Sequence, residues 1–242
     1  MPELQGIMNS LFIENIVNLY GDLGKAWLER LPVIIKKLQS RWHLRDICFV
    51  DNMTFNFVAK AITDARENVI LKIGYDRKTI VDEAQALRYF NGEGSVFLIA
   101  DDEEYNALLL QQALPGTTLK SLKLTQSDSI LNHYAGVLKK LHSKRLTNGN
   151  YPHISDWLIA IDKASTDKFP AHVLAKAMQI KNKLLNTANT QLLLHGDLHL
   201  DNILQNDLQW IAIDPKGVIG DPEFEIFAFD FMQYDEIENS AD

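Results

Sequence analysis

Two short segments in the last quarter of the sequence carry side chains that could do chemistry. The first, HGDLHLDN over residues 195–202, follows an apolar run and contains Asp197 and Asn202. A second apolar run ends at Asp214 and continues as Pro-Lys-Gly. Carboxylate and amide oxygens suit a hard cation such as Mg²⁺, and a carboxylate can also orient a hydroxyl group. The pattern therefore predicts that two short strands deliver Asp197, Asn202 and Asp214 to a polar site.

HGDLHLDN and IDPKG resemble the catalytic and metal-binding motifs of the aminoglycoside phosphotransferases, a branch of the protein-kinase-like fold. Residues 213–225 (IDPKGVIGDPEFE) and 24–32 (GKAWLERLP) are most similar to the streptomycin 6-phosphotransferase and hydroxyurea phosphotransferase subgroup. The resemblance covers roughly residues 20–230. It implies that Asp197 is the base that orients the acceptor hydroxyl, while Asn202 and Asp214 hold Mg²⁺ against the phosphates of ATP. Phosphoryl transfer needs a positioned hydroxyl and neutralised phosphate charge, and this set of residues meets that need.

A kinase also needs a lysine for the nucleotide phosphates and an acidic partner that fixes it. Lys72 lies inside the apolar run VILKI, where a charge requires a compensating group. Glu83 lies at the edge of the apolar stripe of the following predicted helix. We therefore expect an ion pair between Lys72 and Glu83; the alternative is two surface charges.

The predicted turn at 51–56, DNMTFN, occupies the position of the phosphate-covering loop. It lacks the G-x-G-x-x-G pattern of protein kinases, which counts against a protein kinase. The resemblance implies a Ser or Thr hydroxyl and backbone N–H groups at this place, so Thr54 and Asn56 are the candidate phosphate contacts. A plain hairpin turn is the alternative.

The link at 110–115, LQQALP, falls where the family's hinge offers backbone groups to the adenine edge. Gln111 and Ala113 are assigned to nucleotide binding from position only. Lys216 departs from the smaller residue expected after the Asp-Pro pair, and the sequence leaves open whether it touches phosphate or faces solvent.

The elements around these residues predict an α+β protein. Apolar residues at helical spacing predict an N-terminal helix that Pro32 interrupts or restarts, and a helix over 77–90. Runs at 47–50, 55–61, 68–74, 96–100 and 105–111 predict strands, and helical spacing returns over 127–142, 154–164 and 172–185. We expect a bilobal protein-kinase-like fold, with an antiparallel-sheet N-lobe at 1–112 and a mainly helical C-lobe at 113–242.

Composition narrows the class of protein further. The 242 residues include 46% hydrophobic residues and a single cysteine, Cys48, which excludes a disulfide scaffold and favours a reducing cytoplasm. No apolar run is long enough to span a membrane, and we expect no membrane or secretory segment. The net charge of −8 opposes binding to nucleic acid.

The excess negative charge lies at one end of the sequence. Residues 217–242 contain acidic side chains and no Lys or Arg. Carboxylates there suit a cationic acceptor such as streptomycin, and a solvated acidic face is the alternative. The family continues with further helices after the position of Asp214, so we also expect an acceptor wall that is shortened, truncated or supplied by another chain.

The sequence thus predicts an ATP- and Mg²⁺-dependent kinase that phosphorylates a hydroxyl of a small cationic molecule, an aminoglycoside such as streptomycin, or of hydroxyurea. A pseudokinase that only binds nucleotide, or a kinase of another small metabolite, is the first alternative. A hydrolase with a zinc or manganese site at His195, Asp197 and His199 is the second. The sequence does not indicate an oligomeric state.

Overall fold

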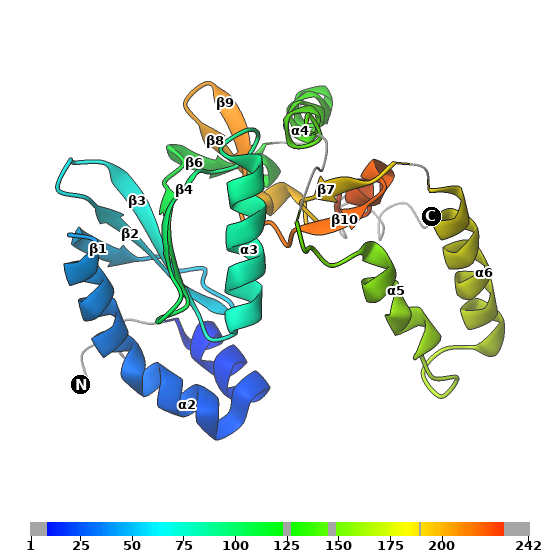
Figure 1. Ribbon diagram of the computed structural model, residues 1–242, viewed down its shortest axis with the longest axis horizontal. Coiled ribbons are helices and arrows are strands. Elements are labelled where there is room, and N and C mark those ends of the chain that lie inside the picture. The colour runs from blue at the N-terminus through cyan, green and yellow to red at the C-terminus, as the bar shows by residue number, and fades with distance from the viewer. Residues whose placement is uncertain (1–8, 123–126, 145–148, 189, 230–242) are drawn as a thin grey trace, which may run out of the picture. The chain divides into compact units, whose positions relative to one another are not determined.

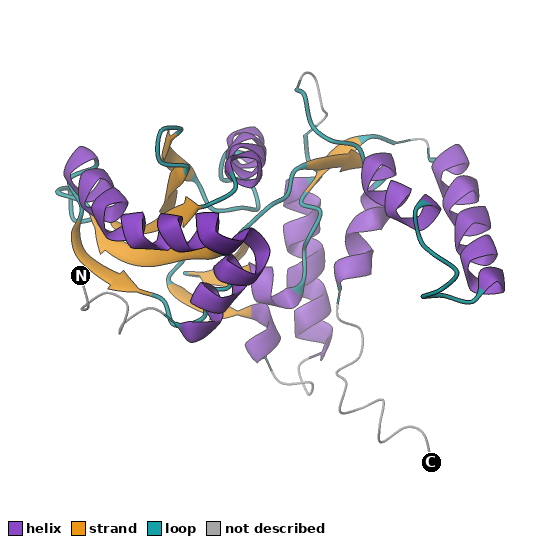
Figure 2. Ribbon diagram, turned by 90° about the horizontal axis from the view of Figure 1, so that it is seen from below, coloured by secondary structure: helices purple, strands orange, loops and turns teal. Residues whose placement is uncertain are grey.

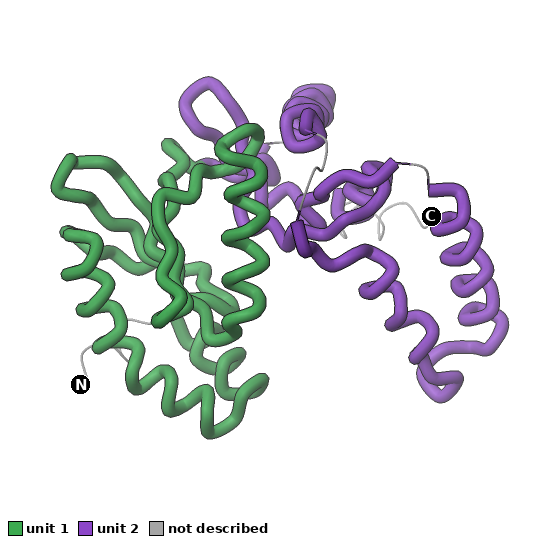
Figure 3. The backbone as a smooth tube through the Cα atoms, in the orientation of Figure 1, with its two compact units in different colours: residues 1–116 green, residues 117–242 purple. Residues whose placement is uncertain are grey.

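The computed structural model describes residues 9–122, 127–144, 149–188 and 190–229. The chain divides into two compact units, residues 1–116 and 117–242 (Figure 3). Both units contain helices and strands (Figure 2). The α+β class predicted from the sequence is confirmed. No helix in the described ranges is long and apolar enough to cross a membrane.

Unit 1 is built on a five-stranded antiparallel sheet (Figure 1). Its order is β1 (Arg45–Phe49), β2 (Asn56–Ile62), β3 (Asn68–Gly74), β5 (Ala107–Gln111) and β4 (Leu98–Asp102). β3 is the middle strand, so both of its edges are hydrogen-bonded to neighbours. A side chain that points from β3 is therefore held in a fixed place against the covering helix.

Two helices cover the opposite faces of this sheet (Figure 1). α2 (Ser10–Arg41) packs its apolar stripe against Val69, Leu71 and Ile73 of β3. The alternate residues of β3 point to the other face, where α3 (Arg77–Phe90) lies. Asp76 caps α3 by accepting hydrogen bonds from the N–H groups of Lys78 and Thr79.

Unit 2 combines helices with two small sheets. The helices are α4 (Ser127–Leu141), α5 (Ile154–Asp162) and α6 (Ala171–Thr187), close to their predicted bounds. β7 (Leu192–Leu194) pairs with β10 (Val218–Gly220), and β8 (Ile203–Asn206) forms a hairpin with β9 (Gln209–Ala212) that β6 (Pro115–Thr118) extends. Short 3₁₀ helices occupy 119–121, 200–202 and 222–228. The β7–β10 pair brings the IDPKG segment beside the HGDLHLDN segment.

The sequence prediction for the N-terminal helix was wrong about the position of the break. The chain leaves helical geometry at Gly21, where φ is 57° and ψ is −134°, and it remains helical through Pro32. A proline inside a helix removes one hydrogen bond and costs about 3 kcal/mol. The buried side chains of Leu28, Leu31 and Ile35 lie on both sides of Pro32, and their packing against the sheet offsets this cost.

The backbone at Gly21 has a conformation that favours glycine, so a side chain there should destabilise the protein. We predict that Gly21→Ala lowers the free energy of unfolding by about 1–3 kcal/mol. The matched control is Gly136→Ala in α4, where a Cβ would contact nothing within 4 Å and the backbone is helical. This control should raise stability by up to about 1 kcal/mol. Urea denaturation of both variants measures the difference, and equal effects would contradict the strained conformation.

Candidate active site

Two of the predicted site residues form a buried ion pair in unit 1. Lys72 lies in the middle of β3, between Val58 of β2 and Leu108 of β5. Its Nζ lies 2.9 Å from Oε1 and 2.7 Å from Oε2 of Glu83 in α3. Each side chain is only 4% exposed. The ion pair that the sequence predicts is present, and the two groups satisfy each other's charge inside the unit.

A test of this pair separates its contribution to stability from a role in activity. Lys72→Met leaves the Glu83 carboxylate in the interior without its cation, which should cost about 3–5 kcal/mol of unfolding free energy. The double variant Lys72→Met/Glu83→Leu removes both charges and should recover most of the stability. The role in nucleotide binding that the family resemblance implies for Lys72 predicts that phosphotransfer stays at least about 100-fold reduced in this variant. Denaturation and product assays measure the two effects. The control Lys60→Met, on the exposed side of β2, should change stability by less than about 0.5 kcal/mol.

The predicted phosphate loop connects β1 and β2 at the edge of the same sheet. Thr54 is exposed and Asn56, the first residue of β2, is half-buried. The backbone of the loop is tied to α2, because Asn15 Nδ2 donates to the carbonyl of Thr54 at 3.1 Å and Asn9 Nδ2 donates to the carbonyl of Asp51 at 2.6 Å. The hydroxyl of Thr54 is therefore carried by a braced loop.

Gln111 and Ala113, the positions assigned to the hinge, lie at the end of β5 and just after it. The side-chain oxygen of Gln111 accepts a hydrogen bond from the N–H of Phe97, and the N–H of Gln111 donates to the carbonyl of Phe97. The side chain of Gln111 thus fixes the start of β4, and Ala113 is buried. The assignment of these two positions to adenine binding stays a prediction that rests on the family's hinge.

In unit 2 the predicted site residues lie in and around the loop that follows β7. The ring of His195 is fully buried. Its Nε2 lies 2.7 Å from the carbonyl of Ile213, and its Nδ1 accepts the N–H of Asp197 at 3.2 Å. Both contacts are satisfied by a neutral ring that carries its proton on Nε2. His195 therefore supports the loop.

This arrangement contradicts the hydrolase hypothesis. Both ring nitrogens of His195 are occupied by protein partners, so the ring has no lone pair for a zinc or manganese ion. In the described ranges, no group of three or more His, Cys, Asp or Glu side chains could hold a metal ion.

Asn202 and Asp214 are joined to the same network. Asn202 is 9% exposed, and its Nδ2 donates to the carbonyl of Asp197 at 2.9 Å. The carbonyl of Asn202 accepts a hydrogen bond from the N–H of Ile213 at 2.9 Å. Asp214 is the next residue after Ile213, so its backbone lies close to Asn202. Asp214 has a φ of 60°, which turns the chain sharply at the carboxylate. The structure thus brings together the polypeptide segments of Asp197, Asn202 and Asp214, as the sequence predicts.

Glu225 is the residue that the sequence analysis did not recognise. Its carboxylate is fully buried and accepts the N–H of His195 at 2.8 Å and the N–H of Gly196 at 2.7 Å. Glu225 therefore anchors the loop and is not available to a cationic acceptor. One signal in the sequence marks it: it lies among Phe224, Ile226 and Phe227, where an acidic side chain requires partners.

The environment of Glu225 and His195 shifts the pKa of both groups. Burial acts to raise the pKa of Glu225, but the contact with His142 and the hydrogen bonds from the N–H groups of Gly196 and His195 lower it below its ordinary value. Burial lowers the pKa of His195 below its ordinary 6.5, against the opposing effect of Glu225. The loop is therefore built from an ionised carboxylate and a neutral imidazole.

These shifts predict that acid destabilises the protein through His195. The folded state has the lower pKa, so the unfolded chain binds a proton at His195 first as the pH falls through about 6.5. The stabilisation is complete above this value and is lost toward the lower pKa of the folded state. Urea denaturation between pH 7.5 and 5.5 should show a shallower loss of stability in His195→Asn than in the wild type. The matched control is His172→Asn on the exposed part of α6; an equal change of slope in that variant would contradict the assignment.

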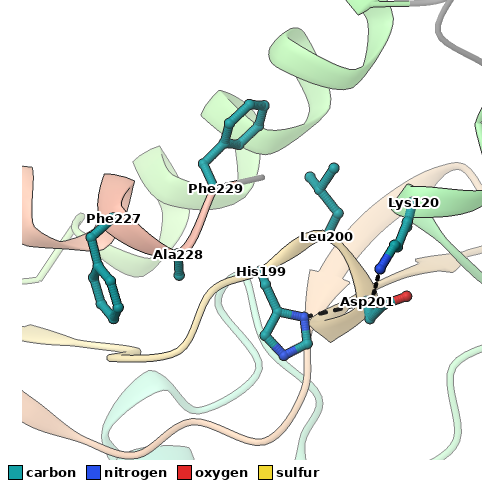
Figure 4. Close-up of a pocket in the computed structure, with 7 residues that line it drawn as sticks. All are labelled: Lys120, His199, Leu200, Asp201, Phe227, Ala228 and Phe229. Atoms are coloured by element: carbon teal, nitrogen blue, oxygen red, sulfur yellow. Dashed lines mark hydrogen bonds and ion pairs between the residues drawn. The ribbon is translucent and has the colours of Figure 1, made fainter. Parts of the chain in front are cut away.

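A cavity of about 300 Å³ opens beside the same loop (Figure 4). Its walls carry His199, Leu200 and Asp201 from the loop and the aromatic rings of Phe227 and Phe229 from the segment after β10. Lys120 pairs with Asp201 at 2.9 Å on one wall. The cavity therefore combines apolar rings with charged groups and has the size of a small-molecule site.

An antiparallel sheet with a buried Lys–Glu pair, together with an Asp, Asn and Asp set on two joined loops, defines the class of protein-kinase-like phosphotransferases. Comparison with known proteins agrees with this class. A family model described as aminoglycoside/hydroxyurea antibiotic resistance kinase matches residues 41–239. The chain therefore belongs to this family of kinases, and the fold and enzyme class that the sequence predicts are confirmed.

Relatives and solved structures are consistent with the family. The chain is 27% identical to streptomycin 6-kinase of Streptomyces griseus over 92% of this chain and 74% of the relative. It is 28% identical to hydroxyurea phosphotransferase of Kitasatospora aureofaciens over 85% of this chain and 62% of the relative. The fold is similar to that of aminoglycoside phosphotransferase APH(4)-Ia in complex with ADP and hygromycin B, with a TM-score of 0.62, 16% identity, and coverage of 80% and 74% of the two chains.

Proposed function

We propose that this kinase transfers the γ-phosphate of ATP to a hydroxyl group of a small acceptor, either a cationic aminoglycoside such as streptomycin or hydroxyurea. The observation that carries the proposal is the hydrogen-bonded network that links the loops of Asp197, Asn202 and Asp214. The names of the two relatives support the acceptor class. The cavity beside the loop has room for a small molecule.

The side chains of Asn202 and Asp214 fit Mg²⁺. Asn202 uses its amide nitrogen to donate to Asp197, so its amide oxygen is free of that bond and remains a ligand atom. Two protein oxygens suit Mg²⁺, which keeps several water ligands and binds phosphate oxygens. When bound, the ion neutralises negative charge on the phosphates of ATP.

Asp197 is the proposed base. Its backbone is held on both sides, by the ring of His195 and by the amide of Asn202, while its side chain is 38% exposed and can reach an acceptor. As the acceptor oxygen forms its bond to the γ-phosphorus, the bond to the β-phosphate oxygen breaks and its electron pair leaves with ADP. The proton of the hydroxyl passes to the carboxylate of Asp197.

We assign nucleotide binding to an N-lobe of residues 1–112 and phosphotransfer to a C-lobe of residues 113–242. Lys72, fixed by Glu83, contacts the nucleotide phosphates in this proposal. Thr54 and Asn56 contribute the loop over the phosphates, and the backbone from Gln111 to Ala113 meets adenine. Because ATP and a reducing environment are found there, we place the enzyme in the cytoplasm.

The experiment is a mass-spectrometric assay with ATP, Mg²⁺ and either streptomycin or hydroxyurea, in which the acceptor gains one phosphate. Asp197→Ala should lower kcat by about 100- to 10,000-fold, because the base is lost. The control Asp167→Ala removes an exposed carboxylate of the same unit and should leave kcat unchanged. No phosphate on either acceptor with the wild type would refute the acceptor class, and full activity of Asp197→Ala would refute the base. Stabilisation by ATP and Mg²⁺ without turnover would favour a nucleotide-binding module.

A further inference from the structure

The proposed mechanism does not use the side chain of Lys216. Lys216 follows Asp214 and Pro215, and its N–H donates to the carbonyl of His195 at 2.7 Å. Its stem lies against Gly196, where an added Cβ would be 3.4 Å from the Cβ of Lys216. Its Nζ lies 3.5 Å from Oδ2 of Asp197. The side chain thus spans from one loop of the site to the carboxylate of the proposed base.

Buried side chains, those of His195 and Asn202, hold the backbone of Asp197, whereas its carboxylate contacts a half-exposed lysine. Among the residues that the structure describes, Lys216 is the cation that contacts this carboxylate. The two side chains are 42% and 38% exposed, so water screens their attraction and the pair contributes little to stability. A contact that adds little stability can still decide how the carboxylate is oriented.

We propose that Lys216 is a positioning residue for phosphotransfer: its ammonium group holds Oδ2 of Asp197, so that Oδ1 faces the acceptor hydroxyl. Lys216 keeps its proton throughout, and the bonds that form and break are those of the proposed reaction. Orientation of the base matters because a small displacement of a reacting group can lower the rate by about 100-fold. The inference rests on the proposed role of Asp197 and adds the group that aligns it.

Two other roles for Lys216 make different predictions. A surface ion pair without a role in catalysis predicts an unchanged kcat in Lys216→Met. A direct contact between Lys216 and the phosphates of ATP predicts a raised KM for ATP and an effect that remains when Asp197 is neutral. The proposed role predicts a lower kcat, an unchanged KM for ATP, and no further effect once the carboxylate is gone.

The test is a double-mutant cycle with Lys216→Met and Asp197→Asn, measured as kcat and KM for ATP in the 242-residue protein. We expect Lys216→Met to lower kcat by about 10- to 100-fold in the wild-type background and by less than 3-fold in the Asp197→Asn background. Lys216→Arg keeps the positive charge and should retain at least about a third of kcat. An unchanged kcat, a raised KM for ATP, a full effect in both backgrounds, or equal losses in the Arg and Met variants would each overturn the proposal.

A control and a second reaction keep this test separate from the acceptor assignment. Lys140→Met removes a lysine of α4 that contacts Gln209, in the same unit, and should leave kcat and KM unchanged. The cycle is run on ADP release with streptomycin or hydroxyurea, and again with water as the acceptor. If the wild type uses neither compound, the proposed acceptor class fails, and the cycle on the reaction with water still decides the role of Lys216.

Discussion

The buried carboxylate of Glu225 is the group on which the geometry of the loop after β7 depends. It comes from the segment after β10 and receives two backbone N–H groups of the loop after β7. Without this contact those N–H groups would be buried without partners, and the carboxylate would lose two of its hydrogen bonds. Further hydrogen bonds extend from this loop. The ring of His195 contacts the carbonyl of Ile213 and the N–H of Asp197, and the side chain of Asn202 donates to the carbonyl of Asp197. The side chains of Asp197 and Asp214 thus lie half-buried at the ends of this hydrogen-bond network, and Asn202 and His195 are buried within it.

Unit 1 follows the same physical rule with a different pair of groups. The Lys72 and Glu83 charges lie between a five-stranded sheet and a helix, where neither would be stable alone. Burial of a matched pair adds little net stability, because desolvation opposes the attraction. The buried pair holds the ammonium group of Lys72 in one fixed direction, which an exposed lysine could not do. This fixed direction explains why a charged pair occurs in an otherwise apolar interior.

The sequence alone predicts much of this architecture, for identifiable reasons. β3 and α3 have strong apolar periodicity and clear ends, and a charge inside an apolar run identifies Lys72. The motifs at 195–202 and 213–217 place the chemical side chains because those residue types occur together at a characteristic spacing. Glu225 was missed because its partners are backbone N–H groups 29 and 30 residues away. Every residue except proline has such a group, so the residue types of the partners do not reveal the contact. The sequence analysis placed the helix break at Pro32 and not at Gly21. The helix continues through Pro32 because the packing of its buried neighbours outweighs the tendency of proline to interrupt a helix. The strands β6, β8 and β10 have only three or four residues, too few for a periodic pattern.

In the proposed function the loop from Asp51 to Thr54 covers the phosphates of ATP, so its hydrogen bonds to Asn9 and Asn15 have a thermodynamic consequence for nucleotide binding. Glycine-rich phosphate loops are flexible before they bind, and ordering them opposes association. Here Asn9 and Asn15 already hold three carbonyls of the loop, at Asp51, Met53 and Thr54. A loop that is preorganised in this way loses less conformational entropy when phosphates arrive. The hydrogen bonds from Asn9 and Asn15 therefore supply part of the ordering of the loop. In a kinase whose phosphate loop is flexible, the binding of the ligand must supply all of that ordering.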